Sequence, residues 1–146
     1  MYRFEFDPVH RILRACIEGV LTDDSISGFK AEIGQLIAES HPNGCVVDLS
    51  ETKQYDLSVS AIHDASRAAP ALPNVSIPVI IVAPDAYMYG SSRMFQMLSE
   101  ESRPWLRVVR SAVEAYQLLK LESPRFEPLP AESEERKKMW RPREVD

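Results

Sequence analysis

The sequence predicts an α/β domain built on a mixed, mostly parallel sheet with one antiparallel strand at its edge. Short apolar runs alternate with segments of helical period along most of the chain. Such alternation is typical of right-handed crossovers between parallel strands. The composition, 45% hydrophobic and 27% charged over 146 residues, is that of one globular domain. The expected order of elements is ββαβαβαβα, with five strands and about four helices.

The first two strands are predicted as an antiparallel hairpin. Apolar and polar side chains alternate in residues 2–6 and again in residues 11–18, as expected for strands with one buried face. Asp7-Pro8 between them is a turn signal.

A helix is expected to follow Gly19, which we predict to end the second strand. Thr22 is a favourable N-cap, and apolar residues recur at helical spacing as far as Ser40. Pro42 and Gly44 then end the helix.

The rest of the predicted domain alternates strand with helix. Three apolar runs are typical of strands buried in a parallel sheet, namely residues 45–49, 77–83 and 106–109. Three segments of helical period alternate with them, namely residues 58–69, 87–102 and 111–121. The polar stretch 50–56 is expected to be a loop.

Residues 122–146 form a charged, proline-containing C-terminal tail, distinct in composition from residues 1–121. Such a composition is typical of disorder. However, Phe126, Leu129 and Trp140 are apolar anchors whose burial can offset the entropy lost on ordering. We therefore expect a domain of residues 1–121 with a docked tail.

Charge, hydropathy and cysteine usage exclude several functional classes. A net charge of -5 with a pI of about 5.3 argues against nucleic-acid binding, which needs a basic face. The longest apolar run, residues 79–83, is too short to span a membrane, and no stretch looks like a signal peptide. Cys16 and Cys45 fit neither a zinc site nor a disulfide framework, and instead suit the core of a cytoplasmic protein.

No pattern in the sequence indicates catalysis. Nucleophile-elbow, metal-binding and dinucleotide-binding motifs are missing, and no pair of catalytic carboxylates stands out. We therefore expect a protein that is not an enzyme and needs no metal or cofactor.

Three motifs, together with the order of elements, carry a resemblance to a known family. They are Ile17-Glu18-Gly19-Val20-Leu21-Thr22, Val46-Val47-Asp48-Leu49-Ser50, and Ala83-Pro84 followed by Tyr89-Gly90-Ser91-Ser92-Arg93-Met94-Phe95. Over residues 4–121 the chain resembles the STAS superfamily, the fold of the bacterial anti-sigma-factor antagonists, and within it the SpoIIAA-like (STAS/SEC14-like) branch. The resemblance implies a regulatory module that works by binding a protein partner.

The same resemblance draws attention to the start of the predicted helix 58–69. Anti-sigma-factor antagonists carry a phosphorylatable serine there, in an Asp-Ser-Ser/Thr-Gly segment. This chain has Asp56-Leu57-Ser58-Val59 instead. Ser58 is thus a candidate phosphorylation site within a partner surface at residues 56–63, or else simply an N-cap. Asp48 and Asp56 are expected to support the neighbouring loops.

A second candidate surface is the segment from Tyr87 to Met97, which is rich in methionine, tyrosine and small residues. Arg93 offers a fork for a carboxylate or phosphate, and free N–H groups would add to it if a helix began near Gly90. The candidate binding residues are Tyr87, Tyr89, Gly90, Ser91, Ser92, Arg93, Met94 and Met97. They suit an apolar pocket for a small anionic or lipid-like ligand, a protein interface, or ordinary core and surface. A homodimer is expected, through helices that the sequence does not identify.

Overall fold

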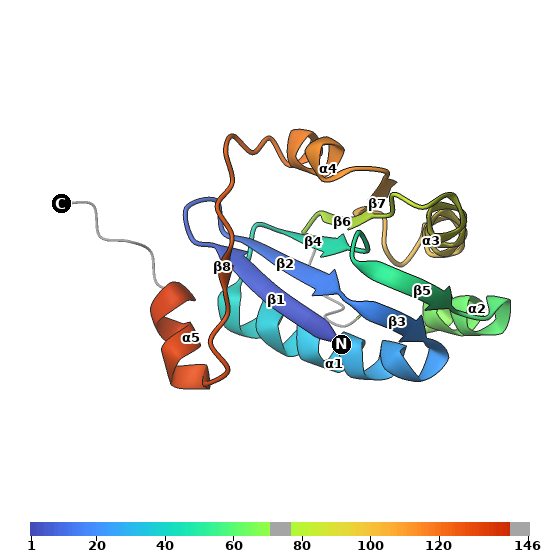
Figure 1. Ribbon diagram of the computed structural model, residues 1–146, viewed down its shortest axis with the longest axis horizontal. Helices are drawn as coiled ribbons and strands as arrows, with labels where there is room; N and C mark the ends of the chain where they lie inside the picture. The colour runs from blue at the N-terminus through green and yellow to red at the C-terminus, as the bar shows by residue number, and fades with distance from the viewer. Residues whose placement is uncertain (71–76, 141–146) are drawn as a thin grey trace.

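The computed structural model describes residues 1–70 and 77–140, in which helices lie on both sides of a central sheet (Figure 1). The strands are β1 (Tyr2–Asp7), β2 (Ile12–Ile17), β3 (Gly19–Thr22), β4 (Gly44–Asp48), β5 (Thr52–Asp56), β6 (Val79–Val82), β7 (Leu106–Val109) and β8 (Glu127–Pro128). The helices are α1 (Asp23–Ser40), α2 (Val59–Arg67), α3 (Ala86–Leu98), α4 (Ala112–Leu118) and α5 (Ser133–Trp140).

The main sheet has the strand order β7-β6-β4-β2-β1-β8. Strands β2, β4, β6 and β7 run parallel, whereas β1 is antiparallel to β2 over all six of its residues. The predicted hairpin and the predicted mostly parallel sheet are therefore both confirmed.

Three strands and one helix go beyond the predicted five strands and about four helices. Gly19 begins β3 rather than ending a strand, and residues 52–56 form β5 rather than a loop. These two strands pair in parallel as a separate small sheet. The sequence of β5 is mostly polar because most of its side chains face solvent, so it lacks the apolar pattern of a strand. The tail supplies the other two elements, β8 outside β1 and helix α5.

Gly19 is the point at which the chain leaves the main sheet for the small one. Its φ of +78° lies in the left-handed region, which glycine adopts without a Cβ penalty. The Gly19 N–H donates to the Glu51 carbonyl over 3.2 Å, which brings the chain beside β5. The bend therefore directs β3, and the start of α1 after it, away from the main sheet.

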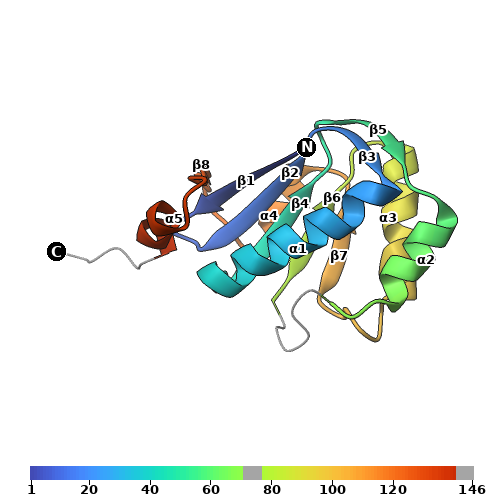
Figure 2. The same ribbon diagram turned by 90° about the horizontal axis from the view of Figure 1, so that it is seen from below.

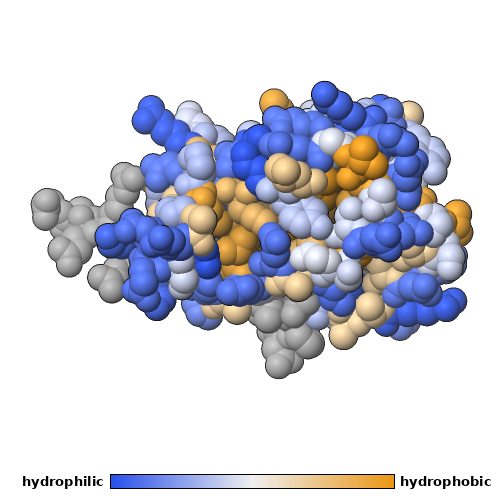
Figure 3. Space-filling model, turned by 60° about the horizontal axis from the view of Figure 1, so that its bottom comes forward, coloured by the Kyte–Doolittle hydropathy of each residue, from blue (hydrophilic) through white to orange (hydrophobic). Residues whose placement is uncertain are grey.

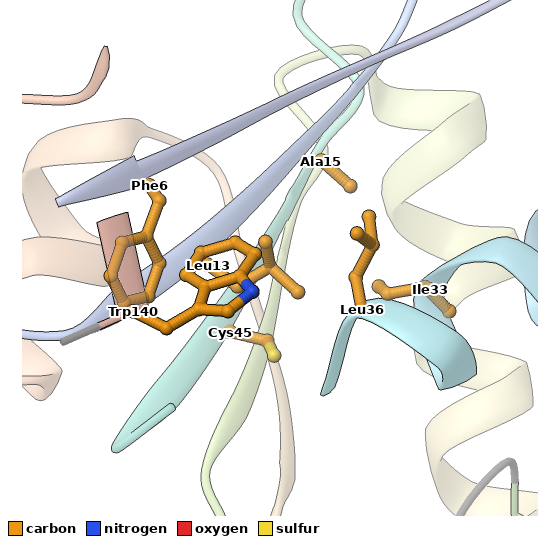
Figure 4. Close-up of a cluster of buried hydrophobic side chains, with 7 residues drawn as sticks. All are labelled: Phe6, Leu13, Ala15, Ile33, Leu36, Cys45 and Trp140. Carbon is orange, nitrogen blue, oxygen red and sulfur yellow. The ribbon is translucent and has the colours of Figure 1, made fainter. Parts of the chain in front are cut away.

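The two faces of the main sheet are covered differently. Helix α1 covers one face, and α4 covers the β6–β7 side of the other (Figures 1 and 2). Figure 4 shows the cluster on the α1 face, which joins Phe6, Leu13, Ala15, Ile33, Leu36, Cys45 and Trp140. Burying side chains of this kind supplies most of the stability of a small domain.

Trp140 belongs to this cluster although it lies in the C-terminal tail. Its ring meets the ring of Phe6 edge-on at 4.7 Å, and its carbonyl accepts from Arg11 Nη1 over 2.7 Å. Helix α5 is also tied to α1 by a two-pronged ion pair, in which Arg136 Nε and Nη2 each lie 3.1 Å from the Glu39 carboxylate. The predicted tail, residues 122–146, thus packs on the sheet edge as far as Trp140, and residues 141–146 lie outside the described residues.

Asp7 connects the first hairpin with the start of the tail. Its buried carboxylate accepts from the N–H groups of Val9 (2.9 Å) and Arg125 (3.1 Å), and from the backbone and ring of His10 (3.1 and 2.8 Å). Burial alone would raise the pKa of Asp7, but the hydrogen bonds from His10, Arg125 and Val9 outweigh burial and lower it. The charged carboxylate therefore stabilises the fold.

Replacing Gly19 should separate backbone strain from packing, because an added Cβ there meets nothing within 4 Å. We expect Gly19→Ala to lower the free energy of unfolding by about 1–2 kcal/mol, the cost of left-handed backbone for alanine. Gly90→Ala is the matched control, since Gly90 also has open space but lies within α3. That variant should gain up to about 1 kcal/mol. Urea unfolding in dilute solution measures both, and equal effects would contradict the backbone explanation.

Asp7→Asn should make the chain less stable in a pH-dependent way. The folded pKa of Asp7 lies below its ordinary value, so its contribution is present above about pH 4 and is lost as the pH falls through the folded pKa. The stability gap between wild type and variant should therefore be largest near pH 7 and narrow below about pH 4. Urea unfolding across this range tests the prediction, and a gap independent of pH would contradict it.

Candidate functional site

The starts of α1 and α2 lie side by side because the strands before them are parallel neighbours. The last residue pair of the small sheet is Thr22 with Asp56. Helix α1 begins directly after Thr22, and α2 begins three residues after Asp56. Parallel strands end at the same edge of a sheet, so the positive ends of both helix dipoles meet here.

Ser58 joins these two helix starts. As the N-cap of α2, its hydroxyl accepts from the Ala61 N–H over 3.0 Å. The same hydroxyl donates to Asp23 Oδ2 over 2.8 Å, and the Ser58 N–H donates to Asp23 Oδ1 over 2.9 Å. The Asp23 carboxylate, on the first residue of α1, thereby binds the start of α2 in a two-pronged contact.

The contact is open to solvent, because both Ser58 and Asp23 are exposed. Val59, the next residue, has 61% of its surface exposed, while Leu57 packs against the core beneath β3 and β5. The site therefore presents an exposed hydroxyl, a carboxylate and an apolar side chain at one accessible corner. An anionic group on Ser58 would be stabilised by the α2 dipole and destabilised by repulsion from the Asp23 carboxylate.

Sequence analysis drew attention to Ser58 but did not assign Asp23 to this site. Their pairing depends on β5, which the sequence does not indicate, and on the bend at Gly19. The one available signal is that a serine and an aspartate each begin a helix that follows a strand. That signal becomes informative only once the two strands are known to be adjacent.

The two predicted loop-supporting aspartates lie in different settings. Asp48 is buried at the end of β4, where it accepts from Arg14 Nη2 over 2.9 Å and from the N–H and hydroxyl of Ser50. Asp56 is exposed at the end of β5 and accepts from Gln54 Nε2 over 2.6 Å. Asp48 thus braces the turn into the small sheet.

The candidate residues on α3 do not share one environment. Tyr55 reaches the hydroxyls of Ser91 and Ser92 from β5, and burial raises the pKa of its phenol. Tyr89 faces Arg110, whose guanidinium lies 5.2 Å from the ring centroid. These inward residues hold α3 against its neighbours.

Tyr87, Gly90, Arg93 and Met97 face outward, and Met94 is half-buried beside them. The hypothesis that a helix starts near Gly90 is wrong, because α3 begins at Ala86 with Asp85 as its cap. The Gly90 N–H is therefore used inside the helix rather than free for an anion.

Two cavities lie elsewhere in the molecule. One, of about 400 Å³, lies between α1, β1 and the tail, and the other, of about 570 Å³, lies where β3 and β5 begin. In Figure 3 patches of apolar surface are visible among hydrophilic residues. Neither cavity is lined by a residue of α3. Arg93 instead donates to Gln96 Oε1 over 2.6 Å.

Across residues 1–70 and 77–140, no group of three or more His, Cys, Asp or Glu side chains is placed to hold a metal ion. Nor does any helix of this described part have the length and apolarity needed to cross a membrane.

Comparison with known proteins gives a match in structure but not in sequence. No family model and no curated protein matches the chain. The anti-sigma factor antagonist SpoIIAA in its unphosphorylated form matches with a TM-score of 0.56 at 14% identity, over 84% of this chain and all of that one. The Bacillus cell fate determinant SpoIIAA in its phosphorylated form matches with a TM-score of 0.51 at 16% identity, over 82% of this chain and 99% of that one.

Sequence identity this low supports a likeness of architecture alone. The chain therefore has the STAS-like fold of the SpoIIAA anti-sigma factor antagonists.

Proposed function

We propose that this chain is a non-enzymatic regulatory module that binds a protein partner through the surface at residues 56–63, and that phosphorylation of Ser58 controls this binding. The observation that supports the proposal most is the exposed Ser58 hydroxyl, which caps α2 and contacts Asp23. The fold adds support, because SpoIIAA has been described in both unphosphorylated and phosphorylated forms.

Phosphorylation of Ser58 would change its contact with Asp23. A phosphate on Ser58 carries a charge of about -1.5 to -2 and replaces the hydroxyl proton that Asp23 accepts. The hydrogen bond from Ser58 to Asp23 is lost, and the two anionic groups repel each other. The N-terminus of α2 still favours the negative charge. Phosphorylation would therefore separate Asp23 from Ser58 while α2 remains helical.

The alternative function is a carrier of a small anionic or lipid-like ligand near residues 87–97, and it has less support. Its outward side chains stand on an open helix surface, and Ser91 and Ser92 are engaged with Tyr55. A ligand pocket would instead surround most of its ligand.

We also propose that the protein works in the cytoplasm. Cys16 and Cys45 are both free and buried. Burial raises the pKa of the Cys16 thiol, and raises the pKa of Cys45 to about 12. Unpaired thiols of this kind suit a reducing compartment.

A double-mutant cycle should measure the coupling between Ser58 and Asp23. Aspartate caps a helix about as well as serine, so Ser58→Asp alone should keep the cap but lower the free energy of unfolding by up to about 1 kcal/mol through repulsion by Asp23. In an Asp23→Asn background the same change should cost almost nothing. Chemical unfolding of the four proteins gives the coupling.

Salt and a cap-deleting variant serve as controls for this cycle. The repulsion should shrink at high salt, because both groups are exposed and therefore screened. Ser58→Ala should cost about 1 kcal/mol in the Asp23→Asn background, where it removes the cap, and more beside Asp23, where it also removes the hydrogen bond to that carboxylate. A cost for Ser58→Asp that is the same with and without Asp23 would refute the proposed switch.

A photo-crosslinking amino acid at position 59 should identify the partner surface. Val59 borders Ser58, and Val113 on α4 is a matched control because it is equally exposed, at 63% against 61%. We expect a protein from extracts of the source cells to be captured from position 59 and not from position 113. The same protein, once purified, should bind the wild-type chain and bind Ser58→Asp at least about tenfold more weakly.

Two results would overturn the proposed function. One is capture of the same protein from both positions, which would indicate non-specific contact. The other is equal binding of the purified protein to wild type and Ser58→Asp, which would leave Ser58 as a helix cap alone.

A further inference from the structure

Only half of the outer edge of β1 is covered by the tail. Strand β8 pairs with Glu5 and Phe6, and one further hydrogen bond runs from the Leu129 N–H to the Phe4 carbonyl over 3.0 Å. Figure 1 shows β8 beside the end of β1 that is farther from the N-terminus. Within residues 1–70 and 77–140, no residue that follows Leu129 pairs with β1. The half of the edge nearer the N-terminus is therefore open.

Three backbone groups of β1 point toward this open half. Within a strand the backbone groups of alternate residues point to the same side. The Phe4 carbonyl faces the tail, whereas the Met1 carbonyl faces the other way and accepts from the Glu18 N–H over 2.8 Å. The Tyr2 N–H, the Tyr2 carbonyl and the Phe4 N–H thus lie on the tail side, and the described chain offers them no hydrogen-bond partner. An open row of this kind is a template for another strand.

The cavity of about 400 Å³ lies beside these backbone groups. It is lined from three elements, by residues 2–4 of β1, by Glu32, Gln35 and Leu36 of α1, and by residues 128–131 and Arg136 of the tail. Leu36 is buried, and Phe4 and Leu129 pack against the same core cluster. The cavity therefore offers apolar surface next to an open strand edge. These are the two features by which proteins bind an extended peptide, with the backbone paired to the edge and a side chain in the cavity.

Carboxylates outnumber cations around this cavity. Arg136 is paired with Glu39, and the lysines of α5 are paired with glutamates of the same helix. Arg3 is bound by three carboxylates, those of Glu5, Glu18 and Glu51. Glu32 is exposed and has no ion pair within the described residues, and the exposed Arg125 lies at the far end of β1. The surroundings therefore favour a basic occupant.

We propose that the open half of the β1 edge binds an extended segment of a partner protein, which adds to the main sheet as a further strand. Backbone hydrogen bonds to Tyr2 and Phe4 supply affinity, whereas an apolar side chain in the cavity and a lysine or arginine beside Glu32 supply specificity. A second copy of this chain is a poorer occupant, because its own edge carries the same excess of carboxylates. The groove contains none of residues 56–63, so this proposal and the one on Ser58 can fail independently.

Amide hydrogen exchange tests whether the edge is open in the free chain. The Phe4 N–H points to the open side and should exchange on the order of 100-fold faster than the Glu5 N–H, which points toward β2. NMR resolves the two amides in one sample. Equal protection of both would show that the edge is already covered and would overturn the proposal.

A phage-displayed library of random peptides, about eight residues long, is the probe for binding. Peptides enriched on the wild-type chain should carry an apolar residue and a lysine or arginine on the same face of a strand. A selected peptide is then synthesised with a methyl group on one backbone nitrogen at a time. Methylation should abolish binding at every second position, because only alternate amides of an added strand face β1.

Two pairs of variants locate the peptide on the chain. Gln35→Trp fills the mouth of the cavity and should raise the Kd of the peptide at least about tenfold, whereas Ala38→Trp, on the same helix but outside the cavity, should not. Both positions are exposed, so both variants should unfold at the denaturant concentration of the wild type.

Glu32→Lys should raise the Kd about fivefold, and Asp64→Lys, which changes the net charge equally from α2, should leave it unchanged. Ser58→Asp should also leave peptide binding unchanged, since residue 58 lies outside the groove.

Three further outcomes would overturn the proposal. If no peptide were enriched on the wild type over Gln35→Trp, the groove would not be a peptide site. A selected peptide that tolerated methylation at every position would bind without joining the sheet. A wild-type chain that dimerised, and lost the dimer in Gln35→Trp, would have a second copy as the occupant of the groove.

Discussion

The left-handed backbone at Gly19 determines how the candidate site is built. Strand β2 belongs to the main sheet and β3 to the small one, although only one residue lies between them. The bend lets β3 pair with β5 instead of continuing beside β4. Because β3 and β5 are parallel, the helices that follow them start at the same place. Without this bend Asp23 and Ser58 would have no reason to meet.

The Ser58 hydroxyl at the start of α2 has two roles. The Ser58 hydroxyl stabilises α2 as a cap and also supplies the proton for Asp23. Both helix dipoles favour negative charge at this corner, so they stabilise the single carboxylate of Asp23 there. A second negative charge, on Ser58, would also be stabilised by the helix dipoles. It would, however, repel the Asp23 carboxylate at hydrogen-bond distance. The site is therefore stable with one anion and sensitive to a second.

The main sheet was predictable from the sequence because its strands are buried and its helices amphipathic. Residues 45–49 and 77–83 are apolar because helices cover both faces of the strands they form, β4 and β6. The small sheet was not predictable, since β5 is mostly exposed and its pairing is set by a backbone torsion. Ser58 was found through a resemblance, whereas its partner Asp23 required the topology. The helical period of residues 87–102 already placed Gly90 within a helix, and the Asp85 cap excludes the alternative of a helix start near Gly90.

Helix α2 is held at both ends, which limits how far a change at Ser58 can spread. At its C-terminal end the buried Arg103 donates to the carbonyls of Ser66 (3.3 Å) and Ala68 (3.0 Å), and its guanidinium lies 5.2 Å from the ring centroid of Phe95 on α3. A cation suits the negative end of a helix dipole. Burial lowers the pKa of Arg103, but arginine remains charged because its ordinary pKa is above about 12. Separating Ser58 from Asp23 therefore frees one end of α2 while the other stays anchored to α3. If Ser58 is phosphorylated as proposed, the response would be confined to the corner at which the partner is proposed to bind.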